Sequence, residues 1–269
     1  MAAHVDGPTP SRITVLLALS KQLFYHQLIL MVRYPVNTLG HFITLFVLFS
    51  IIFFGGHTVA GPAFADSLGG IVMGFFLFTM VTVAYSALAW NVTREAQWGT
   101  LEQLFMSPHG FGRVLGVKTA VNLVMSVLWG FVLLGMMMVL TGRILRIDVI
   151  TILPIVLFTL LSVVGIGFVF AGLALLFKRI ENIFQLVNFG FVGLIAAPAA
   201  GESSLYALPV TQGSSLLFRA MNDGVRLWEF SAVELSILIV VGVGYMIAGY
   251  GVFLLLLRRA RRQGVMGHY

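Results

Sequence analysis

The sequence contains no cysteine and very little charge, and each absence excludes a class of protein. Without cysteine the chain has neither a disulfide framework nor a thiolate metal site. Only 10% of its 269 residues are Asp, Glu, Lys or Arg, whereas soluble domains carry about 25%. With 59% hydrophobic residues and a mean hydropathy of +1.00, the chain cannot cover a soluble surface. The composition predicts an integral membrane protein.

The long apolar stretches hold no Asp, Glu, Lys or Arg in their centres. Ion- and proton-coupled carriers place ionisable side chains inside the membrane, because the coupling ion needs ligands there. His41 is the one ionisable candidate in the first stretch, and its position near the membrane edge indicates a structural role. The sequence therefore disfavours a self-standing carrier.

The segment "GRVLGVKT" has a spacing of Gly112, Gly116, Lys118 and Thr119 that is similar to a phosphate-binding loop but does not match it. A phosphate-binding loop needs four residues between its glycines and a lysine directly after the second glycine. Here three residues intervene, and Val117 separates Gly116 from Lys118. The loop would also have to follow a buried strand, whereas this one leads into an apolar stretch. We expect no nucleotide site in this chain.

Catalytic and metal-binding groupings are missing as well. Glu95 and Glu102 share a helical face, but about 10 Å of helix rise separates them, which is far for one reacting centre. The six histidines are scattered, with no metal-ligand or triad spacing. The net charge of +6 is spread over short loops and the tail, which argues against a nucleic-acid partner. We expect a non-enzyme without catalytic, cofactor-binding or metal-binding residues.

What the sequence does contain is a series of apolar stretches of about 20 residues, the length needed to cross a bilayer. The fifth is interrupted by Gln185 and Asn188. Before them, residues 12–34 predict an amphipathic interfacial helix, with Lys21, Gln22 and His26 on its polar face. The six stretches run roughly over residues 37–56, 67–90, 119–140, 149–177, 182–200 and 235–257.

The segments between and after these stretches complete a single all-α membrane domain over residues 1–269. Residues 201–234 are too polar to span and predict short helices packed at the outer interface. Residues 258–269 form a basic tail, "RRARRQG", for which contact with anionic lipid is favoured over a specific partner site.

The distribution of Lys and Arg predicts the orientation, because cytoplasmic loops carry an excess of these residues. With the N-terminus inside, twelve fall on the cytoplasmic side and four outside, which places both termini in the cytoplasm of a multi-pass protein of the cell membrane. The cytoplasmic set is Arg12, Lys21, Arg33, Arg94, Arg113, Lys118, Lys178, Arg179, Arg258, Arg259, Arg261 and Arg262. The outer set is Arg143, Arg146, Arg219 and Arg226.

The densest polar chemistry lies in the cytoplasmic segment "REAQWGTLEQLFMSPHGFGRVLGVKTA", residues 94–120. With Thr93 as its N-cap, a short helix over about 95–106 is expected, broken by Pro108 and Gly110. Leu101, Leu104 and Phe105 give it an apolar ridge with a polar rim, which suits docking into a groove of another protein. The alternative is a helix that lies on the membrane surface.

This segment resembles the region after the second span in type-2 ABC exporter permeases, whose pattern is R-E-x-x-x-G-T-L-E-x-L-x-x-S-P followed by a glycine and a lysine. A second match, "LPVTQGSSLLFRAMNDG", is similar to that family's L-P-x-T segment before the last span and depends on Leu208, Pro209, Thr211 and Arg219. The residues of the first match are Arg94, Glu95, Gly99, Thr100, Leu101, Glu102, Leu104, Ser107, Pro108, Gly116 and Lys118.

The resemblance implies a permease with an elbow helix, six spans, a coupling helix and re-entrant outer helices. ATP and Mg would be bound by separate ABC ATP-binding subunits, and a second permease copy or a sister permease would complete a dimer in the lipid bilayer. Contact with the ATPase is implied for Arg94, Glu95, Gly99, Thr100, Leu101, Glu102, Leu104 and Phe105, and for Lys21, Gln22 and His26 of the elbow helix.

The family's substrate path is lined by its second and fifth spans, which implies an apolar or amphipathic cargo here because this path offers rings and amides but no charges. For each nominated residue, ordinary packing or lipid contact is the alternative. The nominated residues are Phe75, Phe78, Thr79, Thr82, Phe184, Gln185, Asn188 and Phe191. A second functional class stays open, namely a membrane anchor or assembly protein that recruits a cytoplasmic partner without moving cargo.

Overall fold

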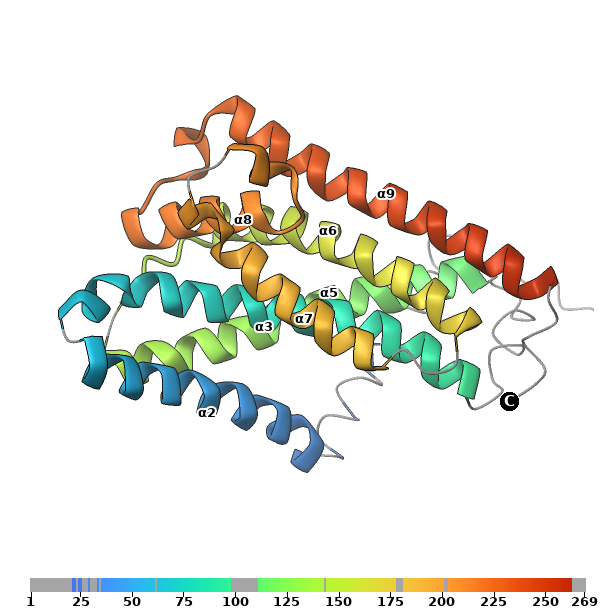
Figure 1. Ribbon diagram of the computed structural model, residues 1–269, viewed down its shortest axis with the longest axis horizontal. Helices are drawn as coiled ribbons and strands as arrows, with labels where there is room; N and C mark the ends of the chain where they lie inside the picture. The colour runs from blue at the N-terminus through green and yellow to red at the C-terminus, as the bar shows by residue number, and fades with distance from the viewer. Residues whose placement is uncertain are drawn as a thin grey trace, which may run out of the picture.

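The computed structural model describes residues 35–60, 62–97, 111–142, 144–177, 181–200 and 203–262, together with Lys21, Gln22, Phe24, Tyr25, Ile29 and Arg33. Regular structure in these ranges is entirely helical (Figure 1). The α-helices are α2 (Pro35–Ala60), α3 (Pro62–Gln97), α5 (Phe111–Thr141), α6 (Val149–Leu176), α7 (Glu181–Ala196), α8 (Thr211–Phe218) and α9 (Ala232–Arg262). The short elements are η1 (Ala197–Ala200), η2 (Ser203–Ala207), η3 (Arg219–Asp223) and η4 (Leu227–Glu229).

Among the described residues, four helices are long and apolar enough to cross a membrane, which confirms the membrane class expected from composition. They are Ser67–Ser86 in α3, Val114–Thr141 in α5, Val149–Leu176 in α6 and Ala232–Ala260 in α9. Two further predicted stretches coincide with shorter apolar helices, Ile43–Gly56 in α2 and Ile183–Ala196 in α7.

The described part of the fifth stretch forms the helix α7. Its 16 described residues rise about 24 Å. Beyond Ala196 the chain tightens into the 3-10 turn η1, which contains Pro198. Because proline removes a backbone donor, it does not continue an α-helix. The chain then turns back toward α8 instead of leaving the bundle.

The helix α3 lies at the centre of the bundle and packs against α2, α5, α6, α7 and α8. Its buried side includes Phe76, Leu77 and Met80, which belong to the main core. The most extensive single pairing joins α6 to α9. There the two backbones approach closely, because a methyl group on Gly249 would clash with the carbonyl of Gly165.

The ends of the helices gather into two opposite ends of the molecule. In Figure 1 the left end carries the α2–α3 and α5–α6 connections, together with α8. The right end carries the C-terminal ends of α3, α6 and α9 and the beginning of α5. The first helical residues of α9 follow a capping box, in which Val233 N–H donates to Ser231 Oγ and Ser231 N–H donates to Glu234 Oε2.

Candidate functional site

The helix α3 carries four of the predicted path residues on one side, and two of these side chains are buried. Thr79 and Thr82 are buried, while Phe75 and Phe78 are partly buried. The Thr79 hydroxyl donates to the carbonyl of Phe75 at 2.8 Å, so it is satisfied inside its own helix. Phe75 also meets Phe49 of α2 edge-on at 5.3 Å between ring centroids.

The helix α7 divides the other four path residues between two faces. Phe184 and Phe191 are buried, and Asn188 between them is partly buried. Their spacing of four and three residues places them on the helix face that packs against α3. Gln185 is exposed and shares the outer face with Phe189. A path inside the protomer and a path along its surface would therefore use different members of the predicted set.

An aromatic cluster joins α3, α6 and α7 around Tyr85, a residue that the sequence analysis did not nominate. The Tyr85 ring meets Phe191 at 5.5 Å, Phe170 of α6 at 5.7 Å and Phe184 at 6.0 Å between centroids, each edge-on. Trp90, one turn further along α3, meets Phe184 at 6.0 Å. Tyr85 stands three residues after Thr82, and that helical spacing is the signal by which it could have been found.

Three polar atoms on this α3–α7 interface are buried without a hydrogen-bond partner in the described part of the chain. They are Thr82 Oγ1, the Tyr85 hydroxyl and Asn188 Oδ1. A buried polar group without a hydrogen-bond partner lowers folding stability by about 1–3 kcal/mol, so three such groups on one interface are clearly destabilising. We name the surface formed by Thr82, Tyr85, Phe184, Asn188 and Phe191 the polar-aromatic interface. It offers hydrogen-bonding groups and ring faces, but no charge.

The helix α8 ties the end of α7 to its neighbours. Thr211 Oγ1 donates to the carbonyl of Leu194 at 3.3 Å, and Ser214 Oγ donates to the carbonyl of Ile195 at 2.6 Å. These carbonyls lie in the last turn of α7, where no intrahelical donor remains. Thr211 belongs to the predicted L-P-x-T segment, and its hydroxyl explains why a threonine suits that position.

Two further contacts of α8 reach α6 and α9. Gly213 packs so closely on Thr159 that a methyl group would clash with its side chain. Gln212 Nε2 donates to the carbonyl of Glu234 at 3.0 Å. The Glu234 carboxylate in turn pairs with Arg219, whose guanidinium also lies over the Phe230 ring at 4.9 Å.

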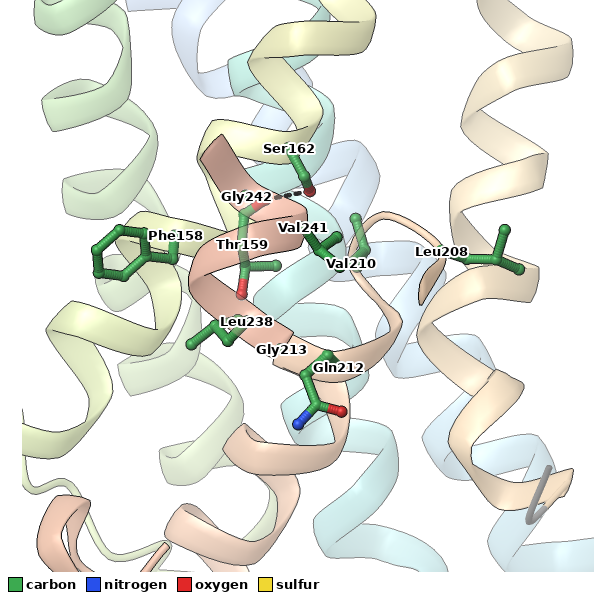
Figure 2. Close-up of a pocket in the computed structure, with 10 residues that line it drawn as sticks. All are labelled: Phe158, Thr159, Ser162, Leu208, Val210, Gln212, Gly213, Leu238, Val241 and Gly242. Atoms are coloured by element: carbon green, nitrogen blue, oxygen red, sulfur yellow. Dashed lines mark hydrogen bonds between the residues drawn. The ribbon is translucent and has the colours of Figure 1, made fainter. Parts of the chain in front are cut away.

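A small pocket lies where α8 meets α6 and α9 (Figure 2). It is lined by Thr159 and Ser162 on one side and by Val210 and Gln212 on another. The Ser162 hydroxyl is already bound to the carbonyl of Thr159 at 2.7 Å. The pocket has room for about one water molecule, so it is too small for a cargo. Val210 closes it with a positive φ of 73°, an unfavourable conformation for a β-branched residue.

The predicted coupling segment begins inside α3 rather than after it. The helix α3 continues unbroken to Gln97, so Thr93 lies within the helix and the prediction that it is an N-cap is wrong. No proline interrupts the chain between Ala63 and Gln97, and nothing else in this stretch ends the helix. Arg94 and Glu95 belong to its last turn. Gly99, Thr100, Leu101, Glu102, Leu104, Phe105 and, in the elbow helix, His26 lie outside the described residues.

The elbow helix is represented by a few described residues, all of them helical. Lys21 and Gln22 are exposed, as the predicted polar face requires. Tyr25 and Ile29 are exposed as well. Pro35 is the first described residue of α2.

Acidic and basic side chains are distributed differently between the two ends of the bundle. Arg33 lies just before α2, Lys118 lies near the beginning of α5, and Arg258, Arg259 and Arg262 end α9, so these cations belong to the end that holds the last turn of α3. The opposite end holds Arg146, Arg219 and Arg226 together with the acids Asp148, Asp223, Glu229 and Glu234. Within the described side chains, every acid belongs to that opposite end. No cluster of three His, Asp or Glu residues that could hold a metal ion occurs among the described residues.

No family model, curated protein or solved structure matches the chain.

Proposed function

We propose that the chain is the membrane-spanning permease subunit of an ATP-driven ABC exporter. One observation carries the proposal. A single unbroken helix of 36 residues, α3, holds the first residues of the coupling motif and also Thr82 and Tyr85 of the polar-aromatic interface. Arg94 follows Thr82 by twelve residues, which is about 18 Å of helix rise. A displacement at Arg94 is therefore transmitted to Thr82 and Tyr85 through one continuous helix.

The proposed coupling mechanism depends on the contacts between α3 and its neighbours. ATP and Mg bind to separate ATP-binding subunits, and closure of those subunits displaces the segment after Gln97. Because α7 rests mainly on α3, a shift of α3 relative to α7 opens the interface between them. The two packings then correspond to states that bind cargo differently, which is the requirement for driving a conformational equilibrium. Two permease copies, or this one and a sister, enclose the path.

The chemistry of the polar-aromatic interface points to the class of cargo. The unpaired oxygens of Thr82, Tyr85 and Asn188 would find partners in a molecule that carries hydroxyl, amide or ammonium groups. The surrounding phenylalanine rings favour an apolar body. An amphipathic cargo such as a drug-like molecule, a lipid or a glycolipid combines both properties.

The charges at the two ends support the orientation that this function needs. The end with Arg33, Lys118 and the last turn of α3 is the more basic, so we assign it to the cytoplasm. Both chain termini then lie in the cytoplasm of a cell-membrane protein, and the coupling segment faces the compartment that contains ATP.

The test is made on the segment that would contact the ATPase. Glu102→Arg combined with Leu104→Asp should abolish co-purification of the ATP-binding subunit and lower cargo-stimulated ATP hydrolysis to the unstimulated rate, because it reverses a charge and breaks the apolar ridge. The matched control is Asp223→Arg with Val233→Asp, a charge reversal and an apolar-to-acidic change at exposed positions of the opposite end.

The proposal fails if no ATP-binding protein accompanies the chain from its native membrane, or if the double variant retains both binding and stimulated hydrolysis. An anchor protein would lose its partner in the double variant but would show no cargo-dependent hydrolysis in the unaltered complex.

A further inference from the structure

The last turn of α9 presents three arginines away from the bundle. Arg258, Arg259 and Arg262 are exposed, whereas Ala260 between them is fully buried and Leu257 is 7% exposed. At 100° per residue the three arginines fall within an arc of about 100°. No ion pair is found for any of them within the part of the chain that the structure describes.

The same side of α9 continues as an exposed apolar strip. Leu255, three residues before Arg258, is 64% exposed, and Ile247, about two turns earlier, is 67% exposed. From Ile247 to Arg258 the helix rises about 16 Å, which is close to half of a ~30 Å hydrocarbon core. The strip therefore matches the acyl chains of one leaflet in length. Gly251 leaves open space within the strip, since an added methyl group would meet nothing within 4 Å.

Charge complementarity decides what covers this surface. The three α9 arginines are exposed and have no ion pair among the described residues, and the described part of the opposite end mixes acids with arginines. A guanidinium group is planar and always charged, and it binds phosphate oxygens in a bidentate manner. An apolar strip that ends in three such groups fits an amphipathic anion, with its phosphate at the arginines and its chain along the helix.

We propose that the C-terminal end of α9 binds anionic phospholipid from the leaflet at this end of the protein. Arg258, Arg259 and Arg262 hold the headgroup phosphate, and Leu255 and Ile247 contact an acyl chain. The site distinguishes anionic from zwitterionic lipids, because zwitterionic headgroups balance their phosphate with an internal cation. By binding along α9, the lipid stabilises the helix that forms the most extensive pairing of the fold, α6 with α9.

The test uses the full chain in detergent and needs no ATPase, so it is independent of the proposed transport function. Phosphatidylglycerol or phosphatidylcholine is added, bound lipids are counted by native mass spectrometry, and the unfolding midpoint is followed by intrinsic fluorescence. The unaltered protein should retain phosphatidylglycerol preferentially and unfold at a higher temperature with it. Arg258→Gln, Arg259→Gln and Arg262→Gln together should lower that preference about a hundredfold, since each cation near an anionic surface contributes about fivefold in affinity.

Two matched variants make the outcome decisive. Arg146→Gln with Arg226→Gln removes exposed arginines from the opposite end and should leave the preference unchanged. Replacement of the three α9 arginines by lysine keeps the charge and should preserve most of the preference, even if the glutamine variant folds poorly.

Two results would overturn the proposal. The glutamine variant could keep its preference for phosphatidylglycerol, or the lysine variant could lose as much of that preference as the glutamine variant. If the glutamine variant kept its lipid preference but lost a bound protein partner, the arginines would be assigned to that partner.

Discussion

At the scale of single residues, Tyr85 is the side chain whose burial is hardest to explain by packing alone. Its ring is fully buried among Phe170, Phe184 and Phe191, and phenylalanine would fill the same space. Its hydroxyl meets no hydrogen-bond partner in the described part of the chain. An unpaired buried hydroxyl lowers the stability of this conformation by about 1–3 kcal/mol. Its presence is explained if the hydroxyl forms a hydrogen bond in a second conformation of the protein.

The substitution Tyr85→Phe tests whether the hydroxyl gains a hydrogen-bond partner in a second conformational state. We expect the unfolding midpoint of the variant to stay the same or to rise, because the substitution removes an unpaired buried hydroxyl. We expect the cargo concentration for half-maximal stimulation of ATP hydrolysis to rise about three- to tenfold, as the loss of one hydrogen bond implies. The two measurements are thermal unfolding in detergent and hydrolysis by the reconstituted complex.

Tyr250→Phe is the matched control, since Tyr250 packs its ring on Phe168 and Phe253 of the α6–α9 pair, outside the polar-aromatic interface. A stabilised Tyr85→Phe variant with unaltered cargo dependence would show that the hydroxyl has no role in transport.

At the scale of elements, α8 connects the end of α7 to the α6–α9 pair. It ends α7 through Thr211 and Ser214, packs on α6 through Gly213, and reaches the first turn of α9 through Gln212. Without these bonds the last carbonyls of α7 would lack donors in a weakly polar environment. The helix α8 therefore acts as the fixed end of α7, while the other end of α7 rests on α3.

Thr211→Val and Ser214→Ala together should loosen this end of α7. Each carbonyl left without a donor costs about 1–3 kcal/mol, so the unfolding midpoint should fall and amide hydrogen exchange should increase over residues 190–196. Ser236→Ala is the control, because the Ser236 hydroxyl donates to Val233 within its own helix. Equal exchange in the double variant and the control would contradict the role given to α8.

Elements of uniform composition could be predicted from the sequence, whereas long-range contacts could not. Four apolar stretches became helices of spanning length, because an uninterrupted apolar run has one stable form in a bilayer. The capping box Ser231–Glu234 is also recognisable from the sequence pattern S-x-x-E. The bond from Thr211 to Leu194 joins residues 17 positions apart, and no local pattern specifies it.

The same distinction applies to the candidate site. Helical spacing was enough to nominate Thr82, Phe184 and Phe191, which the fold brings to one interface. Spacing alone did not reveal that Gln185 would face outward or that Phe75 would turn toward α2. Those outcomes depend on which neighbours cover each helix, and this information appears only in the assembled bundle.

At the scale of the whole molecule, the separation of charge along the bundle axis is the property on which the orientation depends. One end has more Lys and Arg than Asp and Glu in its sequence, and the other carries four described acids beside three arginines. If the basic end is cytoplasmic, the coupling motif, the last turn of α3 and the arginines of α9 all face the same compartment. The proposed coupling role therefore depends on this orientation.

The absence of cysteine makes this premise directly testable, because a single introduced cysteine is the only thiol in the chain. Asp223→Cys and Arg33→Cys place one thiol at each end, both at exposed positions. We expect a membrane-impermeant maleimide to label Asp223→Cys in intact cells and Arg33→Cys only after permeabilisation, since a charged reagent cannot cross the hydrocarbon core. Leu255→Cys, on the lipid-facing strip of α9, should resist labelling in both conditions. The reverse pattern would place the motif that begins at Arg94 outside the cell, away from ATP, and would remove the basis for a coupling helix.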